Sequence, residues 1–214
     1  MKTPLLYAGI DEAGRGPVIG PMVIAIVAGT DEDLKWMKEL RIRDSKLIRA
    51  KERDALSKEI RARCWHEILI IDPTEIDTAV NSDASSLNIL ERDGMRSLIR
   101  AFQDAHADSE ARIMADAIGR YADRYARALI EGAHAIPHHE IRSECKADAN
   151  HLIVGAASIV AKTERECRIA EIRDALGIDF GSGYCSDPKT KAFLASDDLP
   201  REYIRWSWAT MQKR

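Results

Sequence analysis

The sequence predicts an α/β protein with a mixed β-sheet that is antiparallel at its start and flanked by helices. Two strand-like runs open the chain, and strand-like and helix-like segments then alternate through most of it. At Gly181 the pattern changes to a glycine-rich segment and short helices. We therefore expect a main domain over residues 1–180 and a small helical extension over residues 181–214, with no internal repeat.

The chain opens with two apolar runs, Leu5–Ile10 and Met22–Ala28, joined by the turn G-R-G-P-V-I-G-P. Apolar runs bounded by glycine and proline are typical of strands with a tight connection. Two segments with apolar residues at helical spacing follow, Asp31–Leu40 and Arg49–Cys64. The first part of the chain is therefore expected to form two strands and then two helices.

The middle of the chain begins with another strand-like run, Trp65–Ile71, and a short helix is expected after Pro73. Ser85 or Ser86 is typical of a helix N-cap. Apolar residues at helical spacing continue from there to Phe102, which predicts a longer helix.

The second half continues the alternation. Arg112–Ala117 is strand-like, the amphipathic segment Tyr121–Gly132 is expected to form a helix that ends at its glycine, and Ile141–Ala147 is expected to be the last strand. A long alanine-rich helix is expected over His151–Leu176. In the extension, Lys189–Ala195 is expected to form a helix before the tryptophan-containing end R-W-S-W-A-T.

Composition limits the classes of function. The formal net charge is -3 and the isoelectric point is near 6.1, so any nucleic-acid binding must depend on local patches. No apolar run approaches about 18 residues, and acids follow the first apolar run too early for a signal peptide, so we expect a soluble cytoplasmic protein. The cysteines are far apart and are interpreted as unrelated reduced thiols: Cys64, Cys145, Cys167 and Cys185.

Asp11 and Glu12 directly follow the first strand-like run, where acids are unusual. Neighbouring side chains in a strand point to opposite faces, so one carboxylate is expected in a half-buried place that requires a cation or hydrogen bonds. Gly14 and Gly16 let the next loop approach a ligand closely, and Arg15 adds a charge suited to phosphate. A bare Asp-Glu pair would indicate a solvated turn, but the glycines favour a site.

Two further acids are candidates for the same site. Asp116 interrupts a strand-like run, R-I-M-A-D-A, and is expected to rise from the sheet. Asp148 precedes the long helix, where it is either a fourth acid or only an N-cap, a role that Asn150 could also fill. Carboxylates gathered from separate elements would repel one another without a divalent cation, and oxygen ligands suit Mg²⁺ or Mn²⁺ better than Zn²⁺.

Several polar residues are candidates for substrate contacts. Ser158, Lys162 and Arg165 share one face of the long helix and could meet successive phosphates, although the salt-bridge spacing around them supports a solvated charged face equally well. Lys46 in R-D-S-K and Tyr184 in G-S-G-Y are ambiguous in isolation, since most tyrosines pack rather than stack on a base.

The chain carries, in order, the motifs G-I-D-E-A-G-R-G-P-V-I-G-P, R-D-S-K, A-D-A, K-A-D-A, A-A-S-I-V-A-K and G-S-G-Y-x-S-D-P. Together they resemble ribonuclease HII, and W-S-W-A-T is similar to its archaeal and eukaryotic forms. The resemblance covers Gly9 to Thr210. It implies a ribonuclease H-like fold with a C-terminal helical extension. It also implies a monomeric endonuclease for RNA–DNA hybrids and for ribonucleotides embedded in duplex DNA, acting by two-metal hydrolysis that leaves 3′-hydroxyl and 5′-phosphate ends.

The resemblance also implies roles for individual residues. The acids expected to bind metal and catalyse the reaction are Asp11, Glu12, Asp116 and Asp148. The loop expected to sense the ribose 2′-hydroxyl is Gly14, Arg15 and Gly16. Tyr184 matches a tyrosine that stacks at the RNA-to-DNA junction, and Cys185 departs from the proline that many members have next to it. The residues resembling phosphate- and backbone-contacting positions are Lys46, Ser158, Lys162 and Arg165.

Three other classes fit parts of the pattern. An actin-like phosphotransferase also has a glycine-rich hairpin after a strand aspartate, but it predicts a second phosphate loop and a longer chain. A non-catalytic RNA–DNA binding module would tolerate loss of the acids, whereas all four are present. Ribonuclease HIII is disfavoured because its additional N-terminal domain has no room before Gly9.

Overall fold

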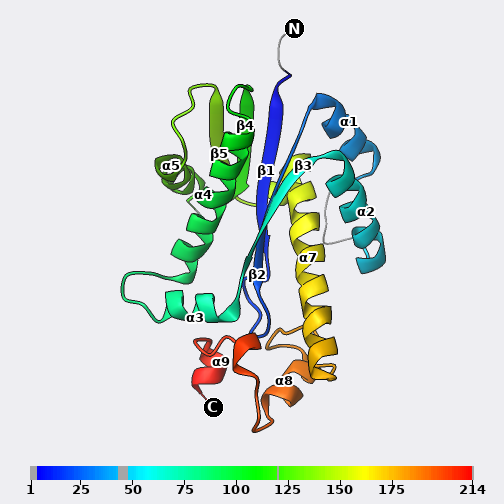
Figure 1. The fold of residues 1–214 in the computed structure, drawn as a ribbon, viewed down its shortest axis with the longest axis vertical. Helices are drawn as coiled ribbons and strands as arrows, with labels where there is room; N and C mark the ends of the chain where they lie inside the picture. Colours follow the sequence, from blue (N-terminus) through cyan, green and yellow to red (C-terminus); the bar gives the residue numbers. More distant parts are fainter. Residues whose placement is uncertain (1–3, 43–47, 120, 214) are drawn as a thin grey trace.

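A computed structural model describes residues 4–42, 48–119 and 121–213. Its centre is a five-stranded sheet with the strand order β3-β2-β1-β4-β5 (Figure 1). The strands are β1 (Leu6–Ala13), β2 (Met22–Gly29), β3 (Trp65–Ile71), β4 (Ala111–Asp116) and β5 (His139–Glu144). The β1–β2 and β2–β3 pairs are antiparallel, whereas β4 runs parallel to both β1 and β5. The predicted mixed sheet flanked by helices is confirmed.

Capping residues and a glycine mark several of the helix ends. A capping box at Thr30 starts α1, Ser86 rather than Ser85 caps α4, and Gly177 ends α7 in the left-handed conformation with φ of 63°. The helices of the main domain are α1 (Asp31–Glu39), α2 (Ala50–Arg63), α3 (Pro73–Val80), α4 (Leu87–Ala105), α5 (Ala122–Gly132), α6 (Ala147–Asn150) and α7 (Leu152–Leu176). The helices after residue 180 are α8 (Pro188–Leu194), the 3₁₀ helix η1 (Arg201–Tyr203) and α9 (Ala209–Gln212).

The first strand is longer than the apolar run that predicts it. It continues beyond Ile10 because the ladder with β2 continues, pairing Asp11 with Ala25 and Glu12 with Ile24. The two acids therefore project from a regular strand to opposite sides of the sheet. Asp11 is buried and Glu12 is half-buried.

The last strand ends earlier than the sequence predicts. It spans His139–Glu144 instead of Ile141–Ala147, because Lys146 adopts a left-handed conformation with φ of 61° and turns the chain out of the sheet. Ala147 then begins the short helix α6, which the sequence analysis did not anticipate.

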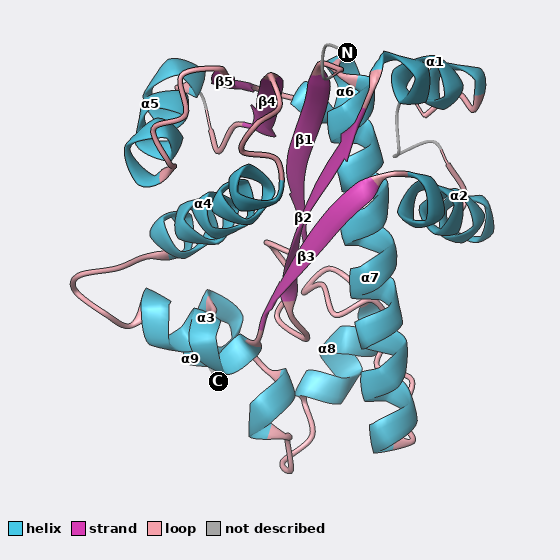
Figure 2. Cartoon of the chain, turned by 45° about the horizontal axis from the view of Figure 1, so that its top comes forward, coloured by secondary structure: helices cyan, strands magenta, loops and turns pink. Residues whose placement is uncertain are grey.

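Helices cover both faces of the sheet, as Figure 2 shows. Strand β2 is buried along its whole length, and its residues alternate between two cores. Ile24 belongs to the core with α4 and α5, whereas Val23 belongs to the core with α1, α2 and α7. In the described ranges, no helix is long and apolar enough to cross a bilayer.

The segment after residue 180 packs beneath the end of β1 and against the end of α7 (Figure 1). A third core joins Val18 and Ile19 of the β1–β2 connection to Ile169 of α7 and to Phe180 and Ile204. An isolated bridge pairs Ile19 with Ile204. The C-terminal segment is therefore built onto the glycine-rich loop, and a division near residue 180 stays a prediction.

Candidate active site

Asp11, Glu12 and Asp116 meet at one edge of the sheet. The first two lie near the end of β1, and Asp116 is the last residue of β4. Because these strands are parallel neighbours, their carboxyl ends lie at the same edge. One carboxylate oxygen from each residue lies within 4.8 Å of the others. Pairing of the strands thus gathers acids that are far apart in the sequence.

Burial and mutual repulsion shape the electrostatics of this acidic trio. Asp11 is only 4% exposed, and burial together with the charge of Glu12 holds the pKa of Asp11 well above its usual value. A hydrogen bond from Ser158 opposes that shift. Burial also raises the pKa of Glu12. Each carboxylate would ionise more readily beside a bound cation.

The donor atoms of the trio fit Mg²⁺ or Mn²⁺. Both ions prefer carboxylate oxygens, and both keep several water molecules in their coordination shell. Among the described residues, the group of possible ligands contains three carboxylates and neither a histidine nor a cysteine. The chemistry of the site therefore favours a hard divalent cation over Zn²⁺.

Asp148 is not one of the three members of the trio. It is half-buried in α6, whose first residue, Ala147, donates its backbone N–H to Asp116 Oδ1 at 2.6 Å. The alternative in which Asp148 is the N-cap of the long helix is wrong, since α7 begins after His151. The short helix that carries Asp148 is thus bonded to Asp116 through its first residue, and a role of Asp148 in the site stays a prediction.

A pocket of about 690 Å³ opens beside Glu12, the member of the trio that lines it. Its walls include Glu12, the Gly14–Gly16 loop and Tyr184. Gly14 has φ of +84°, and a Cβ there would lie 2.4 Å from Arg165 Cδ, so the loop requires glycine at this point. A Cβ on Gly16 would lie 3.6 Å from the Tyr184 ring, which places the ring opposite the loop. The pocket therefore has an acidic end and an aromatic wall.

The Arg15 side chain contacts α4, and its charge also opposes the rise that burial causes in the pKa of Glu12. Its guanidinium forms an ion pair with the fully buried carboxylate of Glu91 and donates a hydrogen bond to Asn88. The positive charge predicted for phosphate binding is thus balanced inside the protein. Glu91 was missed in the sequence, where it is one of many acids in amphipathic helices.

Ser158 and Lys162 form a hydrogen-bonded chain that leads to Asp11. Ser158 is fully buried in α7, and its hydroxyl bonds to the Asp11 carboxylate. Lys162 Nζ donates to Ser158 Oγ at 2.8 Å. Ser158 therefore lies beneath the acids rather than on the exposed helix face that the sequence predicts. Lys46, a further predicted contact, lies outside the described residues.

Arg165 supports the aromatic wall of the pocket. It is only 8% exposed, its guanidinium lies 5.4 Å from the centre of the Tyr184 ring, and it donates to the carbonyl of Ser182 at 3.2 Å. Tyr184 itself is 42% exposed. The arginine thus holds the segment that carries the tyrosine, and the ring remains accessible from the pocket.

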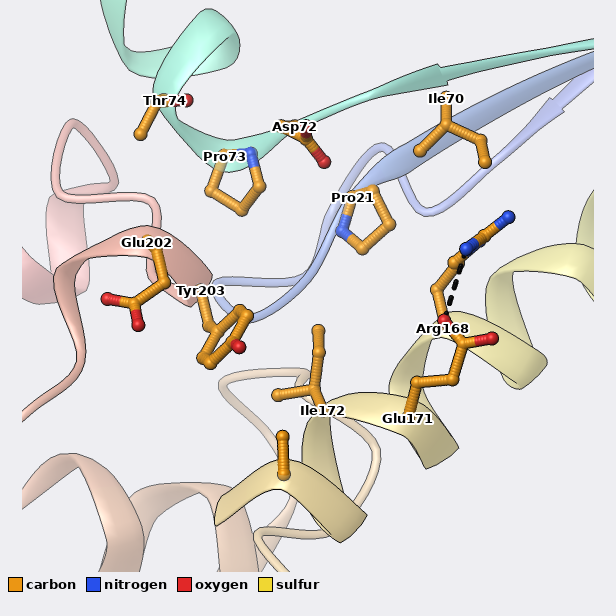
Figure 3. Close-up of a pocket in the computed structure, with 11 residues that line it drawn as sticks. Pro21, Ile70, Asp72, Pro73, Thr74, Arg168, Glu171, Ile172, Glu202 and Tyr203 are labelled. Carbon is orange, nitrogen blue, oxygen red and sulfur yellow. Dashed lines mark hydrogen bonds and ion pairs between the residues drawn. The ribbon is translucent and has the colours of Figure 1, made fainter.

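A second pocket, of about 600 Å³, lies away from the acids (Figure 3). The end of β3, the start of α3, one side of α7 and η1 surround it. Arg168 and Glu171 form an ion pair at its wall, with Arg168 Nη1 3.1 Å from Glu171 Oε2 (Figure 3). Its lining contains none of the predicted site residues. The pocket beside Glu12 is therefore the candidate active-site pocket, because several of the predicted site residues line it.

The comparisons with known proteins agree with this geometry. The family described as Ribonuclease HII matches residues 8–211. A Ribonuclease HII from Methanobrevibacter smithii is 36% identical over 212 residues, which cover 96% of both chains. The ribonuclease H2 of Pyrococcus horikoshii superposes with a TM-score of 0.82 at 31% identity and covers 97% and 96% of the two chains. The RNase HII in a PCNA complex from Archaeoglobus fulgidus gives 0.80 at 36% identity, with coverage of 94% and 95%.

Proposed function

The chain belongs to the ribonuclease HII family of endoribonucleases, and we propose that it hydrolyses the RNA strand of RNA–DNA hybrids and incises duplex DNA at embedded ribonucleotides. The observation that carries this proposal is that Glu12, a member of the acidic trio, lines a pocket that a glycine loop and a tyrosine also line. Carboxylates that hold cations serve phosphodiester cleavage, and a close-fitting backbone loop can read the 2′-hydroxyl that distinguishes RNA from DNA.

The acids are proposed to form the metal-binding site at which the phosphodiester bond is cleaved. In the proposal, Asp11, Glu12, Asp116 and Asp148 are the metal-binding and catalytic acids. These acids would hold Mg²⁺ or Mn²⁺, which would supply activation of a water molecule and neutralisation of charge on the leaving oxygen, consistent with 3′-hydroxyl and 5′-phosphate ends. The bonds from Ser158 to Asp11 and from the Ala147 N–H to Asp116 orient two of the carboxylates in advance.

The pocket selects the sugar. Gly14, Arg15 and Gly16 offer backbone groups at short range to a ribose, and Tyr184 offers a ring on which the sugar or base at an RNA-to-DNA junction can stack. This choice of residues is supported by the position of the ring opposite Gly16. The site can therefore recognise one ribonucleotide without contacting a long RNA strand.

Positively charged side chains around the pocket are proposed to bind the phosphate backbone of the substrate. Lys162 lines the pocket and is half-buried beside Ser158, so its ammonium group lies where a phosphate would approach the acids. Arg165 is more deeply buried than Lys162. Ser158 contributes indirectly, because its hydroxyl oxygen accepts a hydrogen bond from the Lys162 ammonium group. Lys46 completes this group on the strength of the resemblance alone.

Residues 181–214 are proposed to form a substrate-binding extension of a monomeric, cytoplasmic enzyme. Tyr184 belongs to this segment and lines the same pocket as Glu12. Gly183 O accepts the backbone N–H of Val18 at 2.8 Å, which fixes the tyrosine relative to the glycine loop. The extension therefore supplies one wall of the site, while the sheet supplies the acids.

The decisive experiment incubates the purified protein with a DNA duplex that contains one ribonucleotide, and with an RNA–DNA hybrid, in Mg²⁺ or Mn²⁺. Cleavage of both substrates is expected, with loss of cleavage in EDTA and recovery when excess metal is added. An all-DNA duplex of the same sequence is the control and should remain intact. Cleavage that survives EDTA would contradict the metal-binding role, and an uncut hybrid would contradict the proposed function.

A further inference from the structure

Arg205 is the largest fully buried side chain in the described part of the protein, and no ion pair with a carboxylate is found for it there. Its guanidinium instead donates to three backbone carbonyls. Nη2 lies 2.6 Å from the oxygen of Gly14, Nη1 lies 3.0 Å from that of Arg15, and Nε lies 3.0 Å from that of Gly20. One side chain near the end of the sequence thus holds both ends of the glycine-rich loop.

Trp208 extends the same contact by one residue. Its indole Nε1 donates to the carbonyl of Gly16 at 3.0 Å, and its ring lies 4.9 Å from the Arg205 guanidinium carbon. The carbonyls of Gly14, Arg15 and Gly16 are therefore all bound by side chains of the W-S-W segment and its preceding arginine.

The planarity of the peptide bond determines where the N–H groups of the glycine loop point. In a planar trans peptide, the C=O of one residue and the N–H of the next point in opposite directions. Because the carbonyls of Gly14 and Arg15 point to Arg205, the N–H groups of Arg15 and Gly16 point away from it. Within the described ranges, neither N–H has a hydrogen-bond partner, and both residues line the pocket beside the acids.

Burial of the Arg205 guanidinium costs desolvation free energy, because no carboxylate is paired with it in the described part of the protein. Burial lowers the pKa of Arg205 to about 9. An apolar side chain of similar size could fill the same volume, but it could not bind three carbonyls at once. Glycine at residues 14 and 16 leaves the loop with little intrinsic preference for one conformation, so an external donor has to fix it.

We propose that Arg205 is a positioning residue for substrate choice, which points the N–H groups of Arg15 and Gly16 into the pocket as donors to the ribose 2′-hydroxyl. The inference rests on the proposed function, since it assumes that this loop reads the sugar. It adds that sugar reading depends on a residue that touches neither the substrate nor the metal-binding acids.

The test compares binding to two duplexes in EDTA, one with a single ribonucleotide and one of DNA alone. Arg205→Lys keeps the charge but cannot present the planar fork of donors to three carbonyls. Its matched control is Arg96→Lys, because Arg96 Nε also donates to a backbone carbonyl, that of Ala128 at 2.9 Å, away from the pocket. Melting temperatures and circular dichroism check the folding of both variants.

The wild-type protein is expected to prefer the ribonucleotide duplex by roughly tenfold, the value of about two hydrogen bonds. Arg205→Lys should reduce that ratio toward one while the affinity for the DNA duplex stays unchanged, and Arg96→Lys should keep the wild-type ratio. A wild-type ratio in Arg205→Lys, or an equal loss of affinity for both duplexes, would overturn the inference.

Trp208→Phe gives an independent measurement should Arg205→Lys not fold. It removes only the donor to the Gly16 carbonyl, and a partial fall in the ratio is expected, whereas an unchanged ratio would count against the inference. Failure of the proposed function looks different, because the wild-type protein would then leave the RNA–DNA hybrid uncut in Mg²⁺ and Mn²⁺.

Discussion

The carboxylate of Glu91, fully buried in α4, forms an ion pair with the guanidinium of Arg15 in the glycine loop. This contact connects the loop to the helix that covers one face of the sheet. Arg205 holds the same loop from the C-terminal segment by its carbonyls. The loop beside the acids is thus restrained by two buried ionisable side chains of opposite charge.

Replacement of Glu91 by glutamine should destabilise the protein and loosen the loop. The variant leaves the Arg15 guanidinium without its anion, and a lost charged hydrogen bond in a buried place costs about 1–3 kcal/mol. Urea unfolding measures the change in the free energy of unfolding. Asp54→Asn is the control, because Asp54 pairs with Lys58 on the exposed face of α2 and should contribute less than about 1 kcal/mol. Equal effects of the two substitutions would show that the buried pair has no special weight.

Replacement of Asp11 by asparagine should abolish cleavage while substrate binding persists. Asparagine keeps the size of the side chain but removes one negative charge from the trio, which weakens the proposed binding of metal cations. We therefore expect the cleavage rate of an RNA–DNA hybrid to fall by at least about 100-fold. Rates in Mg²⁺ and Mn²⁺ and fluorescence anisotropy with the same hybrid measure the two properties. Asp83→Asn, at an exposed acid in a turn, should behave like the wild-type protein. Cleavage by Asp11→Asn at the wild-type rate would contradict the role of the trio.

Replacement of Tyr184 by alanine should mainly impair incision at a single ribonucleotide. Loss of one stacking contact is worth about 1–3 kcal/mol, which corresponds to a fall of roughly 5- to 150-fold at the junction. The quantity to measure is the ratio of kcat/KM on a single-ribonucleotide duplex to kcat/KM on a long hybrid. Tyr184→Phe should preserve this ratio because the ring remains, and Tyr121→Ala, which removes a tyrosine that is 73% exposed, should also preserve it. Equal losses on both substrates in Tyr184→Ala would argue against junction sensing.

The stability of the protein should decline in mild acid because of two histidines far from the site. Burial lowers the pKa of both His106 and His139, and the rings lie against Phe102 at 4.9 Å and 5.8 Å. A lowered pKa favours the neutral ring in the folded state, so this contribution is complete above the unfolded pKa of about 6.5 and is lost as the pH falls through the folded value.

Urea unfolding at several pH values tests this expectation. His106→Phe should flatten the acid side of the stability profile, whereas His66→Gln, in β3, serves as the control and should leave the wild-type slope. A slope that is the same in all three proteins would assign the acid sensitivity to other groups.

The fold and the acids could be predicted because their signals are local. Asp11 and Asp116 each interrupt or follow an apolar run, and parallel pairing of the two strands makes their meeting a consequence of topology. The left-handed Lys146, which ends the last strand early, has no comparable signature in a run of polar residues. Glu91 and Arg205 were missed for a different reason. Their partners lie 76 and about 190 positions away in the sequence, and neither residue differs in type from the many exposed charges around it.

Arg205 lies near the end of the sequence, so the side chain that restrains the glycine loop is synthesised long after the acids of the site. All three residues of the acidic trio are synthesised by residue 116, whereas the side chain that binds the loop carbonyls is added only at residue 205. Under the role proposed for Arg205, a chain that stops before residue 205 would keep the acidic trio but would lose the restraint on the loop that reads the sugar. In this proposal, substrate selectivity is complete only when the C-terminal segment is in place, and a proteolytic cut before residue 205 would remove it.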